Sequence, residues 1–581
     1  MKNQDENLNK IRHSAAHLLA AAVMDLYPNA KRTIGPAIEN GYYYDFDFGD
    51  EKVSDEDVVK IESKMKEILS SWNSFECEEV TVVEAKKRFA DNPYKLELIN
   101  EFSQEGKTLT IYKSGNFEDL CRGGHVENPA KEIGAFKLLS VAGAYWRGDE
   151  KNKMLTRIYA TAFPSQKELD AYLKQQEEIS KRDHKKLGPQ LDLFTFSNLV
   201  GSGLPLWTPK GTMLRDLLND YVWELRKKYG YQKVTIPHIT KKDLYEKSGH
   251  WAKFSEELFK IETREGHLFA MKPMNCPHHT QIFASRLRSY REMPQRYAET
   301  TMCYRDEQSG ELSGLSRVRG LTQDDAHVFC AFSQAEQEIS NVFDIVKTFY
   351  GTFGFELKPR LSTHDPEHME KYLGDESRWQ EAEAILANFL KSKGVEYLDG
   401  VGEAAFYGPK IDFMSKDALG RTWQVATIQL DLNMAGRFEL YFINEKGEQE
   451  TPVMIHAAIM GSIERFLSIL IEHYGGSFPT WLSPVQIVII PIADRHLDYA
   501  REVENQLLGQ GVRVEVDERA ESMQSKIRDA QMQKIPYMLV VGDKEMESNK
   551  VAVRKRSGEN LGAMDFDQFK TELLKEINDR K

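Results

Sequence analysis

The chain has 581 residues, more than one hydrophobic core usually supports, so roughly three or four domains are expected. With 41% hydrophobic and 29% charged residues, it has the composition of an ordinary soluble protein. Its longest apolar runs are far shorter than the roughly 20 residues of a membrane span. The net charge of −13 argues against a general nucleic-acid coat, although local basic patches can still bind RNA.

The five cysteines are too few, in a chain of this length, to form a disulfide framework. The N-terminus passes directly into an amphipathic segment and lacks the apolar core and cleavage site of a secretion signal. These two features predict a protein of the reducing cytoplasm.

The first predicted element is a helix over residues 8–27, which carries an apolar stripe and ends before Pro28. Mixed helical and strand patterns follow to about residue 158, so the first region is predicted to be α+β. A polar, helix-favouring segment at 165–186 predicts a connecting helix, and the pair Gly188-Pro189 is expected to end it.

Many strand-like stretches separated by helices predict one large domain that extends to about residue 482. After Pro484 strands and a helix alternate, which is typical of a parallel βαβ sheet. The predicted elements of this last part are strands at 485–490, 512–516 and 537–541 and a helix at 497–508. The predicted domains are 1–165, 166–187 (a linker helix), 188–482 and 483–581.

Three residues of the large domain need a common explanation: Cys276 in MKPMNCPHH, His327 in QDDAHVFC and His456 in VMIHAAIMGS. They lie too far apart in sequence for the short ligand pairs of a zinc finger, so spacing alone does not link them. Each of them could equally be a packed core residue.

Arginines cluster in two segments of the same domain. Arg305, Glu307, Arg317 and Arg319 occur in TMCYRDEQSGELSGLSRVRG, and Arg465 follows in GSIERF. A guanidinium group offers planar paired donors to phosphate oxygens and stays charged when desolvated, so this grouping suits a triphosphate. A single arginine would more often form a surface ion pair.

These segments resemble motifs 2 and 3 of class II aminoacyl-tRNA synthetases, and the helix after Gly211 that leads to VTIPHI resembles motif 1. The segments MKPMNCPHH, SGLSRVRGLTQDDAHVFC, AAFYGPKIDF and PTWLSPVQ are similar to those of threonyl-tRNA synthetases, and the likeness covers about residues 8–575. The resemblance implies an α+β multidomain protein. It implies an α+β editing domain, a catalytic core with an antiparallel sheet and a C-terminal α/β anticodon-binding domain.

The resemblance also implies that Cys276, His327 and His456 hold one Zn²⁺ per subunit, with a position left open for the amino nitrogen and hydroxyl of threonine. Valine lacks the hydroxyl and would leave the metal unsatisfied. The residues implied to surround threonine are Met274, Gln323, Asp325, Tyr407 and Gln429.

Activation is the attack of the threonine carboxylate on the α-phosphate of ATP, so the site must neutralise charge and align the reactants. The residues implied to bind ATP, together with Mg²⁺, are Arg305, Glu307, Arg317, Gln424 and Arg465. Lys410 is implied to join Arg305 and Arg465 at the reaction centre.

From spacing alone, the H-x3-H pair His13 and His17 and the C-x3-H pair Cys121 and His125 are typical of a tetrahedral zinc site. The resemblance implies instead a deacylase that removes serine, which a pocket distinguishes from threonine by only about 1–3 kcal/mol. The implied editing residues are His13, His17, Lys95, Asp119, Cys121 and His125. A structural metal at this cluster and a merely packed helix face remain the alternatives.

The region after Pro484 resembles the anticodon-binding domain of the family, with Glu545 and Arg554 as candidate base contacts. Most members carry a further ubiquitin-like N-terminal domain, for which no room is expected before His13. The implied partners are tRNA(Thr), ATP, threonine and a second copy of the chain, with no membrane. Another class II enzyme, such as the prolyl or seryl enzyme, and a non-catalytic RNA-binding paralogue remain alternatives.

Overall fold

The computed structural model describes residues 2–38 and 40–581 and divides into two compact units, which meet in sequence between residues 177 and 178. This boundary falls inside the helix α6 (Gln166–Arg182). None of the helices in the described ranges has the length and apolar character that a membrane crossing requires.

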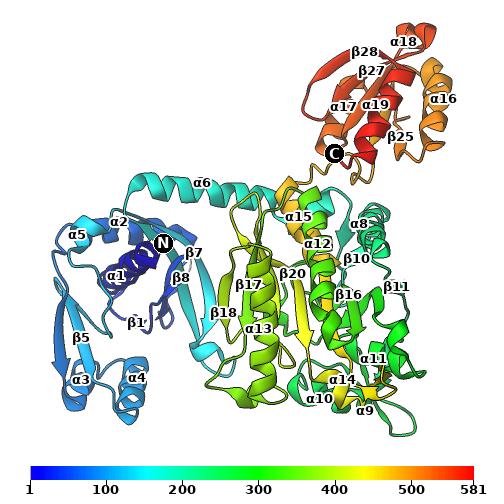
Figure 1. The fold of residues 1–581 in the computed structure, drawn as a ribbon. Helices are drawn as coiled ribbons and strands as arrows, with labels where there is room; N and C mark the ends of the chain where they lie inside the picture. The colour runs from blue at the N-terminus through cyan, green and yellow to red at the C-terminus, as the bar shows by residue number, and fades with distance from the viewer. Residues whose placement is uncertain (1, 39) are drawn as a thin grey trace. The chain divides into compact units, whose positions relative to one another are not determined.

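The first unit contains an antiparallel sheet with a long helix packed on it (Figure 1). This helix, α1 (Lys2–Leu26), buries the predicted apolar stripe, including Ile11, Ala15 and Leu18, and begins earlier than predicted. The strands in spatial order are β1 (Lys31–Arg32), β3 (Gly41–Asp47), β8 (Met154–Phe163) and β7 (Ala135–Tyr145), and β2 (Ala37–Ile38) pairs with β3.

A smaller antiparallel sheet and four more helices complete the first unit before α6. The sheet consists of β4 (Glu76–Val80), β5 (Leu109–Ser114) and β6 (Phe117–Leu120). The helices are α2 (Asp55–Leu69), α3 (Val82–Arg88), α4 (Pro93–Gln104) and α5 (Pro129–Glu132). Asn92 caps α4 by accepting the backbone N–H groups of Tyr94 and Lys95, which fixes the position of Lys95 at the start of that helix.

The predicted connecting helix is divided in two. After α6, Asp183 caps a second helix, α7 (His184–Gln190), by accepting the backbone N–H of Lys185. The prediction that Gly188-Pro189 ends the helix is therefore wrong, because both residues lie inside α7. A proline lacks only one backbone N–H donor, so α7 can include Pro189. The helix ends directly after it, at Gln190.

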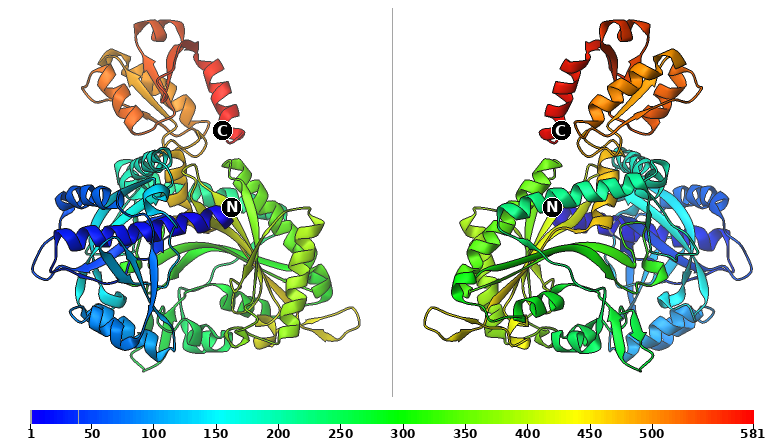
Figure 2. Two further views of the ribbon diagram at one scale, coloured as in Figure 1. Left: turned by 90° about the vertical axis from the view of Figure 1, so that its left-hand side faces the viewer. Right: turned by 90° about the vertical axis from the view of Figure 1, so that its right-hand side faces the viewer.

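The second unit is built on an eight-stranded sheet, which runs antiparallel except at its two edge pairs. Figure 2 shows its green and yellow strands lying side by side. In spatial order the strands are β11 (Gln232–Lys233), β15 (Gln295–Tyr304), β16 (Gly320–Cys330), β23 (Val453–Ser462), β20 (Thr422–Asp431), β19 (Lys410–Lys416), β17 (Leu357–Thr363) and β18 (Leu398–Val401). The predicted antiparallel core is confirmed.

Four long helices pack with the sheet into the largest apolar core of this unit: α8 (Pro209–Lys228), α12 (Ala335–Thr352), α13 (Glu376–Ser392) and α15 (Ile463–Tyr474). Because side chains alternate along a strand, Ala326 and Val328 of β16 join this core while His327 between them points to the opposite face. The same alternation on β23 places His456 beside His327. The sheet therefore has one structural face and one that is free for chemistry.

The second unit also contains shorter elements outside the large sheet. The strands are β9 (Phe194–Thr195), β10 (Leu206–Trp207), β12 (Ile239–Lys241), β13 (Lys260–Glu262), β14 (Leu268–Met271), β21 (Phe442–Ile443) and β22 (Gln449–Glu450). The helices are α9 (Lys242–Ser248), α10 (His250–Lys253), α11 (Cys276–Ala284) and α14 (Met434–Arg437).

The C-terminal part has its own five-stranded sheet, with the order β25 (Val514–Val516), β24 (Ile487–Pro491), β26 (Tyr537–Val541), β27 (Lys550–Lys555) and β28 (Asn560–Asp565). The first three are parallel, as predicted, whereas β27 and β28 pair antiparallel. Its helices are α16 (Leu497–Leu508), α17 (Met523–Met532), α18 (Asp543–Ser548) and α19 (Phe566–Asn578). The bounds of α16 coincide with those predicted.

Candidate active sites

Cys276, His327 and His456, which are distant in sequence, meet on the free face of the large sheet. Their ligand atoms lie within 4.8 Å of one another, and all three residues are buried. His327 and His456 are direct partners across β16 and β23, and Cys276 is the first residue of α11. One thiol and two imidazole groups are ligands that Zn²⁺ prefers, so this group can hold a metal ion.

Each histidine of this group has a second partner that fixes its orientation. His456 Nε2 donates to Asp431 Oδ2 over 3.0 Å, and His327 Nδ1 shares a hydrogen bond of 2.8 Å with Nδ1 of His279. His456 Nδ1 and His327 Nε2 remain for a metal. Burial lowers the pKa of His327, with help from nearby positive charges, and raises that of the Cys276 thiol. A bound cation would reverse the effect at Cys276, because it stabilises the thiolate.

The residues predicted to surround threonine lie around this trio. Tyr407 stacks on His456 at a centroid distance of 4.7 Å, and its hydroxyl donates to Gln429 Oε1 over 2.5 Å. Asp325 Oδ2 accepts from Nδ2 of Asn275 over 3.1 Å, and burial raises the pKa of Asp325 to about 6.

Gln323 and Met274, which are also predicted to surround threonine, lie on segments that carry members of the trio. Gln323 lies on β16, the strand that carries His327, and lines a neighbouring cavity. Met274 is half-buried in the segment that precedes Cys276. Asn275, His279 and Asp431 were not predicted, although Asp431 shares a face of β20 with Gln429 through the two-residue period of a strand.

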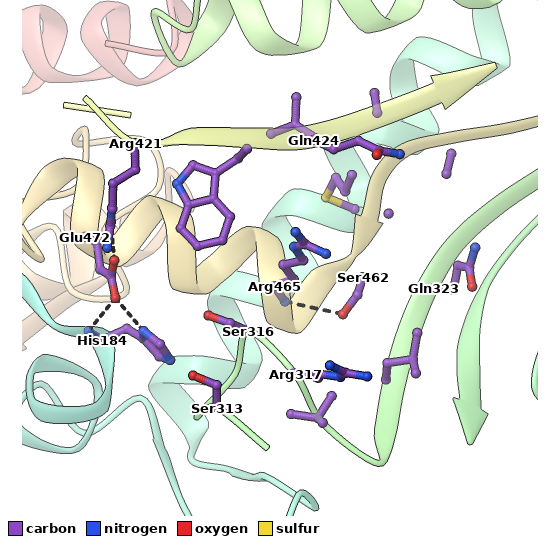
Figure 3. A pocket seen from close by; sticks show the side chains of 18 of the residues that line it. His184, Ser313, Ser316, Arg317, Gln323, Arg421, Gln424, Ser462, Arg465 and Glu472 are labelled. Atoms are coloured by element: carbon purple, nitrogen blue, oxygen red, sulfur yellow. Dashed lines mark hydrogen bonds and ion pairs between the residues drawn. The ribbon is translucent and has the colours of Figure 1, made fainter. Parts of the chain in front are cut away.

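The neighbouring cavity has a volume of about 910 Å³ and is lined by all five residues predicted to bind ATP. Figure 3 labels Arg317, Gln424 and Arg465 among them. In the part of the chain that the structure describes, the guanidinium of Arg305 has no hydrogen-bond or ion-pair partner. Arg465 lies near the start of α15, where its backbone N–H donates to Ser462 Oγ, and its side chain lies over the Trp423 ring at 5.7 Å. Among the described residues, Arg305 and Arg465 thus have no carboxylate partner. Their free positive charge makes the cavity suitable for a polyanion.

The other predicted ATP residues are held by neighbouring side chains. Arg317 forms an ion pair with Glu307 over 2.7 Å. Gln424 donates to Oδ1 of the buried Asp412 over 2.8 Å, and Lys410 forms an ion pair with its Oδ2, also over 2.8 Å. Asp412 therefore connects Lys410 to the wall of the cavity.

The predicted editing residues meet in the first unit. His13 and His17 lie on α1, while Cys121 and His125 lie in the loop after β6, and their ligand atoms are within 4.8 Å of one another. Cys121 Sγ lies 3.0 Å from His13 Nε2 and 3.3 Å from His125 Nε2. Burial lowers the pKa of His125 to about 3 and raises that of Cys121 to about 11, so both groups are neutral at pH 7.

Asp119 lies at the centre of a buried polar network beside this cluster. Its carboxylate pairs with Lys95 over 2.7 Å and Arg32 over 3.2 Å, and it accepts from the Tyr44 hydroxyl over 2.5 Å. Burial raises the pKa of Asp119, but the charges of Lys95 and Arg32 outweigh it and hold the pKa below its usual range. Arg32 and Tyr44 were not predicted. They belong to β1 and β3, and no short motif links them to Asp119.

The two candidate anticodon contacts lie on different elements. Glu545 is in α18, where its carboxylate accepts the backbone N–H of Gly542 over 3.1 Å and so caps the helix. Arg554 is in β27, opposite Met538 of β26. Glu545 therefore has a structural role, the capping of α18, that does not require a nucleic acid.

Comparison with known families agrees with this architecture. Residues 259–474 match the model described as "tRNA synthetase class II core domain (G, H, P, S and T)", residues 486–576 the "Anticodon binding domain", and residues 109–159 the "Threonyl and Alanyl tRNA synthetase second additional domain". The fold and these family matches therefore define a class II aminoacyl-tRNA synthetase. The predicted α+β multidomain class is confirmed.

Individual relatives narrow the class further. The threonine–tRNA ligase of Rubrobacter xylanophilus is 51% identical, over 95% of this chain and 86% of its own length. That of Dehalococcoides mccartyi is 49% identical, over 98% and 97%. The chain belongs to the threonine–tRNA ligase family, as its motifs predicted, and the alternative of a prolyl or seryl enzyme is wrong.

Solved structures show the same fold. The crystal structure of the RNA binding domain of threonyl-tRNA synthetase from Cryptosporidium parvum is 37% identical, with a TM-score of 0.64 over 67% of this chain and 97% of that one. A prolyl-tRNA synthetase from Giardia lamblia, in complex with prolyl-adenylate, reaches a TM-score of 0.55 at 17% identity over 69% of this chain and 81% of its own. The second likeness concerns the fold alone.

Proposed function

We propose that this ligase activates threonine with ATP to give threonyl-adenylate, transfers threonine to the 3′ end of tRNA(Thr), and hydrolyses seryl-tRNA(Thr) at its second site. The proposal rests on one observation: β16 borders both a buried Cys-His-His group, through His327, and the arginine-lined cavity, through Gln323. Among the described residues, Arg305 and Arg465 of this cavity have no carboxylate partner. One place for an amino acid and one for a nucleotide are thus adjacent.

Selection of threonine rests on the Cys276, His327 and His456 group. Cys276, His327 and His456 would hold Zn²⁺, which would coordinate the hydroxyl and the amino group of the substrate. Asp325, on the strand of His327, orients the amino group, while Tyr407 and Gln429 close the pocket over the side chain. Valine has nearly the same shape but lacks the hydroxyl, and it is rejected because the polar partners would remain unsatisfied.

Activation uses the arginines of the cavity. Arg305 neutralises the α-phosphate at which the carboxylate attacks, and Arg317 and Arg465 hold the γ-phosphate. Glu307 and Gln424 contact the nucleoside, and Mg²⁺ enters with the phosphates. Lys410, held by Asp412 beside Gln424, adds positive charge at the reacting centre.

Editing uses the Cys-His cluster of the first unit. The neutral imidazoles of His13, His17 and His125 can accept a hydrogen bond from a water molecule and so position that water near the ester carbonyl. Lys95, held by Asp119, is the cation for the developing oxyanion. Cys121 remains a thiol at neutral pH and orients two of the imidazoles.

The remaining assignments complete the proposal. Residues 1–165 form the editing domain, 166–187 the linker, 188–482 the catalytic domain and 483–581 the anticodon-binding domain, with Glu545 and Arg554 as base contacts. A homodimer forms through the motif 1 region, which contains α8, and the protein works in the cytoplasm.

Amino-acid-dependent exchange of pyrophosphate into ATP tests the first activity. Threonine supports exchange, serine supports it less well and valine does not. Deacylation of Ser-tRNA(Thr), with Thr-tRNA(Thr) as the control, tests the second. No exchange with threonine would refute the proposed activation, and equal exchange with valine would refute the proposed role of the metal group.

A further inference from the structure

His184, the first residue of α7, is a buried histidine at the edge of the cavity proposed to bind ATP, here called the nucleotide cavity (Figure 3). Its two ring nitrogens have different partners. Nε2 accepts the backbone N–H of Leu315 over 3.0 Å. Since an amide N–H can only donate, the ring proton must lie on Nδ1, which donates to Glu472 Oε1 over 2.5 Å. The backbone N–H of His184 donates to the same oxygen over 3.1 Å.

This pairing excludes a metal at the same place. Ligand atoms of Asp183, His184 and Glu472 lie within 4.8 Å of one another, as in a metal site. However, the lone pair of Nε2 is engaged by Leu315 and Nδ1 carries a proton. Glu472 is also shared with Arg421, which binds its second oxygen. The hydrogen bonds themselves account for the cluster.

Leu315 belongs to the loop between β15 and β16 that carries Glu307 and Arg317. This part of the loop is tightly held, because Leu315 is fully buried and Ser316 Oγ lies 3.0 Å from Ser468 Oγ. Gly314 has a φ of +52°, and a Cβ there would collide with the ring of His184. The loop therefore rests directly on His184.

Two contacts hold the loop to α15, one directly through Ser316 and one through His184. Arg465, Ser468 and Glu472 follow one another at helical spacing on one side of this helix. Ser468 holds Ser316, Glu472 holds His184, and His184 holds Leu315. The imidazole thus connects the loop of Arg317 to the helix of Arg465, and it can do so because it donates at one end and accepts at the other.

We infer that His184 is a positioning residue for ATP: it fixes the loop of Arg317 against the helix of Arg465, so that both arginines reach the same phosphate group. The inference rests on the proposed nucleotide site. Threonine, whose pocket lies at the Cys276 group, does not depend on this contact.

Two substitutions distinguish the hydrogen bond that His184 forms with Leu315 from the one that its ring forms with Glu472. In His184→Asn the amide lies at the level of Nδ1 and can still donate to Glu472, but the Leu315 N–H loses its acceptor. In His184→Gln the carbonyl oxygen lies at the level of Nε2 and can replace that acceptor. We expect His184→Asn to raise the KM for ATP about tenfold in pyrophosphate exchange, and His184→Gln to restore most of the loss. The KM for threonine should change less than about twofold.

His364 provides a matched control. Its Nδ1 and backbone N–H bind one oxygen of Glu383 over 2.7 and 2.9 Å, the same pattern as His184 with Glu472, and it is also buried. His364 does not line the nucleotide cavity. His364→Asn should lower the melting temperature to a similar extent as His184→Asn and leave the KM for ATP unchanged.

Calorimetric titration of MgATP in the absence of threonine separates this inference from the proposed function. Wild-type protein that binds MgATP but does not catalyse exchange would refute the proposed activation only, and the binding constants of the variants would then decide the role of His184. An unchanged Kd for MgATP in His184→Asn, or a loss in His184→Gln as large as in His184→Asn, would overturn the inference.

Hydrogen exchange keeps the inference testable if His184→Asn does not fold. In the wild-type protein without nucleotide, the amide of Leu315 should exchange about as slowly as the paired amides of β15 and β16. Rapid exchange at Leu315 while those strands remain protected would show that His184 does not hold the loop.

Discussion

The molecule contains two groups of cysteine and histidine with similar composition, and they differ in where the histidine nitrogens point. In the Cys276 group, His327 and His456 each use one nitrogen for an outer partner, His279 or Asp431. In the His13 cluster, nitrogens of His13 and His125 instead approach the sulfur of Cys121. The first arrangement leaves inward-facing lone pairs for a metal, whereas the second uses its donors and acceptors within the cluster.

Burial separates the two groups as well. All three residues of the Cys276 group are buried, but in the His13 cluster only His17 is, so water can reach the others. A dry site suits the selection of an amino acid by coordination, and a partly open one suits hydrolysis. Residue types alone do not distinguish the two groups. Outer partners and access to solvent do.

The largest expected effect tests this contrast through metal content. Cys276→Ala should lower zinc from about one ion per chain to near zero and reduce threonine-dependent exchange about 1000-fold, because the amino acid loses the group that coordinates it. Elemental analysis and pyrophosphate exchange measure the two effects.

His13→Ala is the counterpart in the other cluster. It should leave zinc content unchanged and reduce the hydrolysis of Ser-tRNA(Thr) by about 100-fold or more, since a hydrogen-bond partner of the attacking water is lost. Two zinc ions in wild-type protein and one in His13→Ala would show that the cluster is a metal site.

A smaller effect is expected at the outer partner of His456. Asp431→Asn preserves size but removes the charge that holds the Nε2 proton. It should weaken zinc binding about 10- to 100-fold, as measured by competition with a chelator. Asp412→Asn, a buried carboxylate on the neighbouring strand with no contact to the trio, is the control and should leave zinc affinity unchanged. Equal loss in both variants would contradict the assignment of Asp431.

The smallest effect concerns pH and the His13 cluster. Burial lowers the pKa of His125 from 6.5 to about 3, so the folded protein keeps this imidazole neutral while the unfolded chain takes up a proton below pH 6.5. The stability from this group is fully present above pH 6.5 and is lost as the pH falls toward 3. His125→Asn should therefore show a weaker decrease in melting temperature between pH 6.5 and 4 than wild type, and an unchanged slope would contradict it.

Hydrophobic periodicity predicted several elements well because it acts locally. The helix at 497–508 has the predicted bounds, and alternation along β16 places Gln323 and His327 on the face away from the helices. The predicted break at Gly188-Pro189 failed because Asp183 caps a new helix earlier in the chain. The antiparallel end of the C-terminal sheet was missed because strand direction depends on pairing, which a single strand does not reveal.

The sequence by itself determined the family, the apolar stripe of α1 and the identity of the residues in the Cys276 group and in the proposed nucleotide cavity, because distinctive motifs carry them. Only the tertiary structure decided which of these residues meet and what holds them. The contacts of Asp431 with His456, of Arg32 and Tyr44 with Asp119, and of His184 with Leu315 join distant segments. Such contacts follow from the packing of whole elements, and no local pattern of residues encodes them.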